Sequence, residues 1–466
     1  STPTAGTSNV RFGVNAGNSI VSGGNYNVVV GDEAGTALTA GDESVAVGFE
    51  ALMTASTGSE NVGIGYRALK LTTGNSNVAV GKNALAANSS ASNNTAVGVN
   101  VLASNTTGTS NTGLGAFALD SNTTASNNIA MGHNALGLNT TGAQNTAIGV
   151  SSLDANTTAD YNTAVGYATL SANTTGTLNT AVGANALGAN TTADNNTAVG
   201  RNALLLNTTG SANTAVGAQG VLDANTTGSQ NTGIGGGALS ANTTASNNTA
   251  VGHASLIRNT TGASNVAVGT DALNFNSTAS NNTAVGQSAL ASNTTASNNV
   301  ALGSQALSAN TTGAQNIAIG HSALDANTTA DYNVAVGFSA LGANTTGSTN
   351  TAVGGLALDA VTTVDSLTAV GHAALSSNTS GTGNVAVGFQ AGTALTTGGG
   401  NTLMGSNAGD SLTTGTTSVA IGTNALHTAT IASGNVAIGY QALDVCTAAN
   451  NTAIGLNAGG SVTSGN

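Results

Sequence analysis

The chain has 466 residues and a net charge of −12 at pH 7, with six lysines and arginines against 18 aspartates and glutamates. It therefore lacks the clustered basic residues on which nucleic-acid binding depends. No apolar run approaches the roughly 18 to 20 residues of a membrane span, so we expect no membrane insertion by this chain. Cys446 is the single cysteine, which excludes disulfides within the chain.

A unit of about 17 residues is repeated about 27 times between Asn9 and Asn451. Residues 196–212 show its regular form, and we number its positions 1 to 17 from Asn196. Position 4 is apolar and position 5 is Gly in every copy. A short period kept over a whole chain indicates a solenoid. Because a strand, a covering helix and two loops need roughly 30 residues, the unit is too short for a helical layer. The sequence predicts an all-β, parallel β-solenoid.

Each unit begins with a short strand at positions 2 to 4. Positions 2 and 4 are mostly β-branched, as strands favour, and lie on the same face because strand side chains alternate. We expect these two positions to point into the solenoid together with the leucine at position 9, for example Leu204. A second short strand is expected to carry the Ala-Leu pair of positions 8 and 9. Asn-Thr-Thr-Gly at positions 12 to 15 is expected to form a turn.

The glycine at position 5 is expected to mark a corner. Only a residue without Cβ suits a strained backbone angle or a close approach of two backbones. The clearest consecutive examples are Gly149, Gly166, Gly183, Gly200 and Gly217.

The repeat runs through the chain without a linker, so a single elongated domain is expected over residues 1–466. Residues 1–90 hold the most varied units. Residues 91–360 are nearly pure repeat, and the motif degenerates over residues 361–466.

If positions 2 and 4 point inward, the alanines at position 3 face solvent as a continuous stripe of small residues. Such a stripe is typical of an interface between chains. The residues expected in it are Ala164, Ala181, Ala198, Ala215 and Ala250. The chain is therefore expected to associate with itself, as a homotrimer or a filament.

Several copies of the motif resemble the head repeats of a known family. The segments 44–48, 316–320, 418–422 and 435–439 read Ser/Asn-Val/Ile-Ala-Val/Ile-Gly, as in the heads of YadA-type trimeric autotransporter adhesins. Similar 17-residue repeats occur in surface proteins and tail-fibre-like proteins of marine bacteria and their phages. The resemblance implies a left-handed β-roll, side-by-side trimers, and a surface that binds cells or host matrix.

Candidate catalytic or metal-binding groups are scattered. His133, His253, His321 and His372 all fall at position 6, but in distant units, whereas a metal site needs three or four converging ligands. Aspartates at position 10, such as Asp154, are also spread over separate units, and no paired carboxylates or phosphate loop stands out. We expect no enzymatic activity, cofactor or metal.

The Asn-Thr-Thr columns are the most distinctive surface feature. Their simplest interpretation is turn chemistry, in which Asn and Thr bond to the local backbone and stack as ladders. The alternative is a regular threonine array that binds ice or a polysaccharide. Its candidate residues are Thr191, Thr192, Thr208, Thr209, Thr243 and Thr244.

The sequence thus favours a non-enzymatic subunit of a structural and adhesive fibre or filament. We expect this fibre to be extracellular or to lie on the surface of a bacterium or virus. Its expected partners are other copies and a cell-surface, matrix or glycan receptor. The alternatives are an ice- or polysaccharide-binding solenoid and the receptor-binding shaft of a phage tail fibre.

Overall fold

The structure is a computed structural model that describes residues 6–218 and 220–463. It is all-β, without a helix among these residues, and forms a parallel β-solenoid of about 27 turns spaced about 17 residues apart. This confirms the predicted fold class. None of the described segments is a helix of the length and hydropathy that crossing a bilayer requires.

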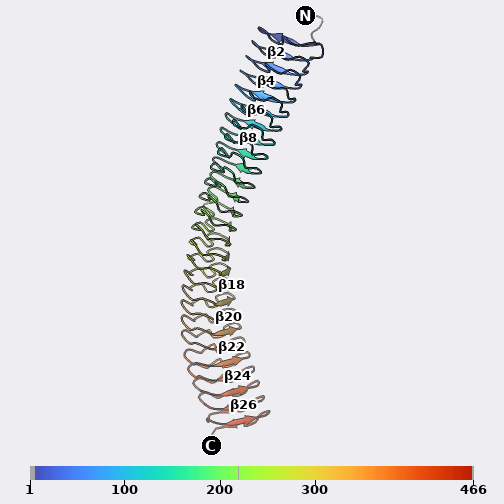
Figure 1. Cartoon of the computed structure of the whole chain (residues 1–466). Coiled ribbons are helices and arrows are strands. Elements are labelled where there is room, and N and C mark those ends of the chain that lie inside the picture. The colour runs from blue at the N-terminus through green and yellow to red at the C-terminus, as the bar shows by residue number, and fades with distance from the viewer. Residues whose placement is uncertain (1–5, 219, 464–466) are drawn as a thin grey trace. The chain divides into compact units, whose positions relative to one another are not determined.

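Contacts divide the chain into two compact units, Ser1–Asn231 and Thr232–Asn466, which are described separately. The single domain expected over residues 1–466 stays a prediction. Within each unit, every turn contributes a three-residue strand to one parallel sheet, where it lies beside the strand of the next turn (Figure 1).

The first unit contains thirteen strands, and each pairs in parallel with the next one along the chain. They are β1 (Val10–Phe12), β2 (Val28–Val30), β3 (Val45–Val47), β4 (Val62–Ile64), β5 (Val78–Val80), β6 (Thr95–Val97), β7 (Thr112–Leu114), β8 (Ile129–Met131), β9 (Thr146–Ile148), β10 (Thr163–Val165), β11 (Thr180–Val182), β12 (Thr197–Val199) and β13 (Thr214–Val216).

The second unit repeats this arrangement and ends with a small two-stranded sheet of β27 and β29. Its strands are β14 (Thr232–Ile234), β15 (Thr249–Val251), β16 (Val266–Val268), β17 (Thr283–Val285), β18 (Val300–Leu302), β19 (Ile317–Ile319), β20 (Val334–Val336), β21 (Thr351–Val353), β22 (Thr368–Val370), β23 (Val385–Val387), β24 (Thr402–Met404), β25 (Val419–Ile421), β26 (Val436–Ile438), β27 (Val445–Cys446), β28 (Thr452–Ile454) and β29 (Ser461–Val462).

The strands pair in register, so each position of the unit forms a column along the solenoid. Between β11 and β12, Thr180 lies opposite Thr197, Ala181 opposite Ala198, and Val182 opposite Val199. Equivalent side chains of adjacent turns therefore lie roughly 4.8 Å apart, the spacing of hydrogen-bonded strands.

The predicted inward and outward faces of the strand are reversed. Ala198 is fully buried, whereas Thr197 is half-buried and Val199 is 36% exposed. The reason is space. At Gly63, which occupies position 3 in β4, an added Cβ would lie 3.1 Å from the carbonyl oxygen of Ala68 and 3.3 Å from Cγ of Leu52. The interior of a regular turn holds a small side chain there, so the β-branched residues face out.

The predicted second strand is also wrong, because positions 6 to 11 form a turn. Residue 202 at position 7 has φ 60° and Leu204 at position 9 has φ 52°, both in the left-handed region. That conformation costs an L-residue roughly 1–2 kcal/mol. Burial of the leucine side chain, which contributes roughly 1.5–3 kcal/mol, offsets the cost. The prediction that position 9 points inward is confirmed.

Two ladders of buried asparagines complete the interior of the regular turns. Nδ2 of Asn207, at position 12, donates to Oδ1 of Asn190 in the preceding turn (3.1 Å) and to the carbonyl of Gly210 (2.9 Å). Nδ2 of Asn196 donates to the same carbonyl (3.0 Å). The backbone amide of Asn196 in turn donates to Oδ1 of Asn179 (3.0 Å). These bonds satisfy polar groups that would otherwise be costly to bury.

Candidate functional site

The outward face of the strands is the most extensive candidate site. We call it the strand face and define it by positions 2 and 4 of β1–β26 and β28. Position 4 is apolar in all these strands, and position 2 is always Thr, Val or Ile. The strand face therefore carries no charge in either unit. Its large side chains are partly exposed, for example Ile64 at 39% and Leu114 at 47%.

The strand face is continuous within each unit because the strands are in register. In the first unit it follows thirteen strands, which corresponds to roughly 60 Å at the usual spacing between strands. Contiguous apolar patches larger than a few hundred Å² are uncommon on monomers and usually mark contacts with another molecule. The strand face is thus suited to contact another molecule along its length.

The predicted alanine stripe does not lie on the surface. All its members are completely buried inside their own turns: Ala164, Ala181, Ala198, Ala215 and Ala250. They cannot mediate contact between chains. Strand alternation places positions 2 and 4 on the face opposite position 3, so the surface role passes to the strand face.

The corner glycines have the predicted geometry. Their φ angles are 132° at Gly149, 139° at Gly166, 126° at Gly183, 134° at Gly200 and 145° at Gly217. A Cβ added to Gly200 would also collide with the carbonyl oxygen of Gly217 in the next turn. The positive φ and the close approach of the next backbone both call for glycine at this position, and both recur from turn to turn.

The two threonines of Asn-Thr-Thr differ in exposure. Thr191, Thr208 and Thr243 are half-buried, and each hydroxyl donates to a carbonyl of the following turn, at 3.2, 3.0 and 3.2 Å. Thr192, Thr209 and Thr244 are exposed. The first column therefore joins turns, as turn chemistry predicts. The role of the threonines as a ligand surface stays a prediction.

The position 6 histidines lie on exposed corners, and three of the four pack against aromatic rings. His321 stacks on Phe338 and His372 on Phe389, each with ring centroids 5.7 Å apart, while His133 meets Phe117 edge-on. No three His, Cys, Asp or Glu side chains of the described residues converge as a metal site would require. Position 6 thus has packing partners in neighbouring turns.

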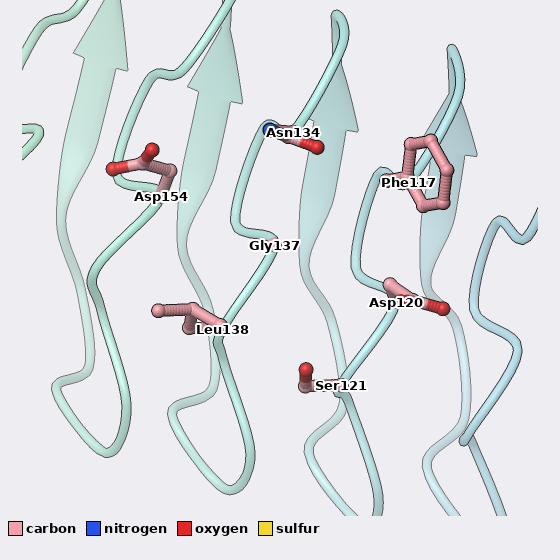
Figure 2. Close-up of a pocket in the computed structure, with 7 residues that line it drawn as sticks. All are labelled: Phe117, Asp120, Ser121, Asn134, Gly137, Leu138 and Asp154. Atoms are coloured by element: carbon pink, nitrogen blue, oxygen red, sulfur yellow. The ribbon is translucent and has the colours of Figure 1, made fainter.

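A small cavity lies on the turn formed by positions 6 to 11, away from the strand face. Its volume is about 270 Å³, and it is lined by Phe117, Asp120, Ser121, Asn134, Gly137, Leu138 and Asp154. Asp120, Gly137 and Asp154 occupy position 10 of three successive turns. Figure 2 shows the two aspartates on the turns to either side of the one that carries Gly137. Burial raises the pKa of both carboxyl groups.

The strand face and the cavity both escaped the sequence analysis, although each leaves a signal. An uncharged and mostly β-branched pair in every unit is compatible with either a core or a contact surface, and the usually small residue between them is the clue to the second. The cavity is signalled by Asp-Gly-Asp at intervals of one unit, which becomes visible once position 10 is read as a column. Comparison with protein-family models and with curated proteins finds no match for this chain.

Proposed function

We propose that this chain is a subunit of a non-enzymatic extracellular fibre or filament whose copies associate side by side through the strand face. The observation that carries the proposal is the uncharged, largely apolar strand face, which follows every turn of both units. All lysines, arginines, aspartates and glutamates of the chain lie at other positions of the repeat. Association would remove apolar surface from water without burying a charge.

A second copy is the partner that fits the strand face best. Its side chains form ridges repeated once per turn, and another copy carries ridges with the same period. Two such faces can therefore interdigitate over many turns, whereas an unrelated surface would match only locally. Because many turns contribute, modest contacts per turn add up along the solenoid.

The wider biological role follows from this assembly. A homotrimer or an open filament would display the charged and threonine-bearing turns outward, where a cell-surface, matrix or glycan receptor could bind. The resemblance of the motif to YadA-type heads supports adhesion at a bacterial or viral surface. A phage tail-fibre shaft is a variant of the same function.

Binding of ice or a polysaccharide is a second candidate function, supported by a specific run of residues. Position 2 is threonine in the last five strands of the first unit: Thr146, Thr163, Thr180, Thr197 and Thr214. In register, these form a regular column of hydroxyl and methyl groups beside the apolar column of position 4. In this alternative the chain acts as a monomer and the strand face stays open to solvent.

Molar mass in solution separates the two candidates. We expect light scattering to give a multiple of the 44.2 kDa chain mass and negative-stain images to show particles or filaments thicker than one solenoid. The variant Val165→Lys/Val182→Lys/Val199→Lys places three charges on the strand face. It should shift the mass toward 44.2 kDa, because burying unpaired ammonium groups is costly.

The matched control places the same charges in neighbouring turns on another surface. Thr175→Lys/Thr192→Lys/Thr209→Lys changes exposed residues at position 14, so it should leave the mass of the assembly unchanged. A wild-type monomer, or equal dissociation of both variants, would contradict association through the strand face. Ice recrystallisation and polysaccharide pull-down assays would then test the second candidate.

A further inference from the structure

The strand face carries no charge and repeats from turn to turn, so by itself it fixes neither the direction nor the register of two copies. The residue at position 6 does vary, and it lies at the corner that borders this face, directly after the corner glycine. We call its first six members the corner column: Val14, Asp32, Phe49, Tyr66, Lys82 and Val99. The order is apolar, charged, aromatic, aromatic, charged, apolar, with an acid in one half and a base in the other. The corner column is therefore complementary to its own reverse.

The corner column is a fixed and exposed feature of the first unit. The backbone amide at position 7 of each turn donates to the position 6 carbonyl of the preceding turn. These bonds run from Glu33 to Val14, Glu50 to Asp32, Arg67 to Phe49, Asn83 to Tyr66 and Asn100 to Lys82, at 2.9 to 3.2 Å. All six side chains of the column are exposed. At its centre the rings of Phe49 and Tyr66 stack with their centroids 5.5 Å apart.

The two charges of the corner column have no partner in their own chain. Ion pairs among the described residues join Glu50 to Arg67 and Lys70, and Asp410 to His427. Asp32 and Lys82 are three turns apart, which is roughly 14 Å at the usual strand spacing and too far for an ion pair. Asp32 is also the only aspartate or glutamate at position 6 of the repeat. Any ion pair that these two residues form is therefore with another molecule.

A second copy that runs in the opposite direction supplies both partners. With a two-fold axis between Phe49 and Tyr66, Asp32 faces the partner's Lys82 and Phe49 faces the partner's Tyr66. The outer valines of the two columns face each other in the same way. In a parallel pair with equal register, Asp32 would face the partner's Asp32 and Lys82 the partner's Lys82. Such like-charge contacts are unfavourable, so the corner column favours the antiparallel pair.

We infer that the first six turns form an antiparallel junction between two copies, in which the corner column sets the direction and the register. The inference rests on the proposed association through the strand face, which supplies most of the contact area. A two-fold axis along the strands brings two strand faces together and places the same corner of both copies side by side. The later turns of each first unit then extend in opposite directions, and their strand face stays free for other copies.

Cross-linking of two single-cysteine chains tests the direction. One chain carries Val14→Cys and the other Val99→Cys, both in a Cys446→Ser background, so the charges of the corner column stay in place. We expect a short bis-maleimide to join residue 14 of one chain to residue 99 of the other in the mixture. Neither chain should be cross-linked alone, because identical residues of the antiparallel pair lie roughly 24 Å apart along the solenoid. Cross-links between identical residues would overturn the junction while leaving side-by-side association, in the parallel direction, intact.

Charge reversal tests what sets the direction. Lys82→Asp in both chains should lower the yield of the 14-to-99 cross-link at least about tenfold, because two acids then face each other. Asp32→Lys/Lys82→Asp exchanges the charges and should restore the yield. The matched control is Arg201→Asp, which makes the same change in net charge at position 6 of a turn outside the column and should have no effect.

Three results would overturn the inference: no cross-link between residues 14 and 99, an equal loss of yield in the control, or no recovery in the double reversal. The molar mass of the wild type decides separately whether the strand face associates. A multiple of 44.2 kDa without the 14-to-99 cross-link would refute the junction alone, whereas a monomer would refute both proposals.

Discussion

Two turns of the solenoid fill the same interior with different side chains. In the regular turn 196–212, Ala198, Leu204 and Asn207 occupy positions 3, 9 and 12. In the turn 401–417 these positions hold Leu403, Gly409 and Leu412. The backbone at position 9 is left-handed in both, with φ 52° and 57°. The larger residue has moved from position 9 to position 3.

The exchange shows what the fold requires. A Cβ added to Gly409 would lie 2.9 Å from Cδ2 of Leu403, so the leucine of the strand uses the space left by the missing leucine of the turn. The same exchange occurs with Val29 and Gly35, where the distance from an added Cβ to Cγ1 is 3.2 Å. The turn therefore fixes an interior volume and a set of backbone angles, while the side chain that fills the volume can come from either side.

The corner glycine is not exchanged between the two turns, so its replacement should have the largest effect. Gly200→Ala combines a φ of 134° with a collision against the next turn, and we expect it to cost roughly 4 kcal/mol. Thermal unfolding, together with hydrogen exchange of the adjacent turns, measures the loss. Gly188→Ala is the control, since its backbone tolerates a side chain, and it should change stability little. Equal effects of the two substitutions would contradict the corner role.

Moving a leucine into the regular turn tests the exchange directly. Ala198→Leu should destabilise by about 3 kcal/mol, because the interior already holds Leu204. Adding Leu204→Gly should recover much of the loss by recreating the arrangement of Leu403 and Gly409. A double-mutant cycle measures the coupling in the free energy of unfolding. Additive effects would show that the two positions do not share one volume.

The asparagine ladder should contribute less per residue. Asn207→Ala removes the hydrogen bonds that Nδ2 of Asn207 donates to Oδ1 of Asn190 and to the carbonyl of Gly210. It also removes the bond that Oδ1 of Asn207 accepts from Nδ2 of Asn225. We expect a loss of about 1–2 kcal/mol, observed by chemical denaturation. Leu412→Ala, at the same position, tests an apolar member of the column and should lose stability by leaving a cavity instead. No effect of Asn207→Ala would mean that the ladder is energetically neutral.

The smallest expected effect on stability comes from neutralising the two aspartates of the cavity, Asp120 and Asp154. Their pKa values are raised in the folded chain, so folding is more favourable when these groups are protonated. This contribution is fully present below the ordinary aspartate pKa of about 3.9 and is lost as the pH rises through the folded value. Asp120→Asn/Asp154→Asn should therefore slightly raise the thermal midpoint at pH 7 relative to wild type. The difference should shrink in acid, and an opposite trend would contradict the desolvation of these groups.

The sequence predicts the turn length, the parallel solenoid and the corner glycines, because Gly200 and its equivalents need both a special angle and a close approach. It does not predict which side of the strand faces inward. Alternation separates Ala198 from Thr197 and Val199, but the choice of side depends on the volume occupied by Leu204 and the asparagines across the interior. Leucine also gives no signal of a left-handed backbone, so the turn at positions 6 to 11 resembled a strand. The cavity at Gly137 depends on stacking between turns, which a linear reading does not display.

The distance between labels in an assembled sample tests most directly whether the strand face joins copies. Spin labels on Val199→Cys, in a Cys446→Ser background, report the distance between equivalent residues of neighbouring copies by pulsed dipolar spectroscopy. The account predicts shorter inter-chain distances for a label at residue 199 than for one at Thr209→Cys. The reverse order, or the absence of any inter-chain signal at both residues, would contradict association through the strand face.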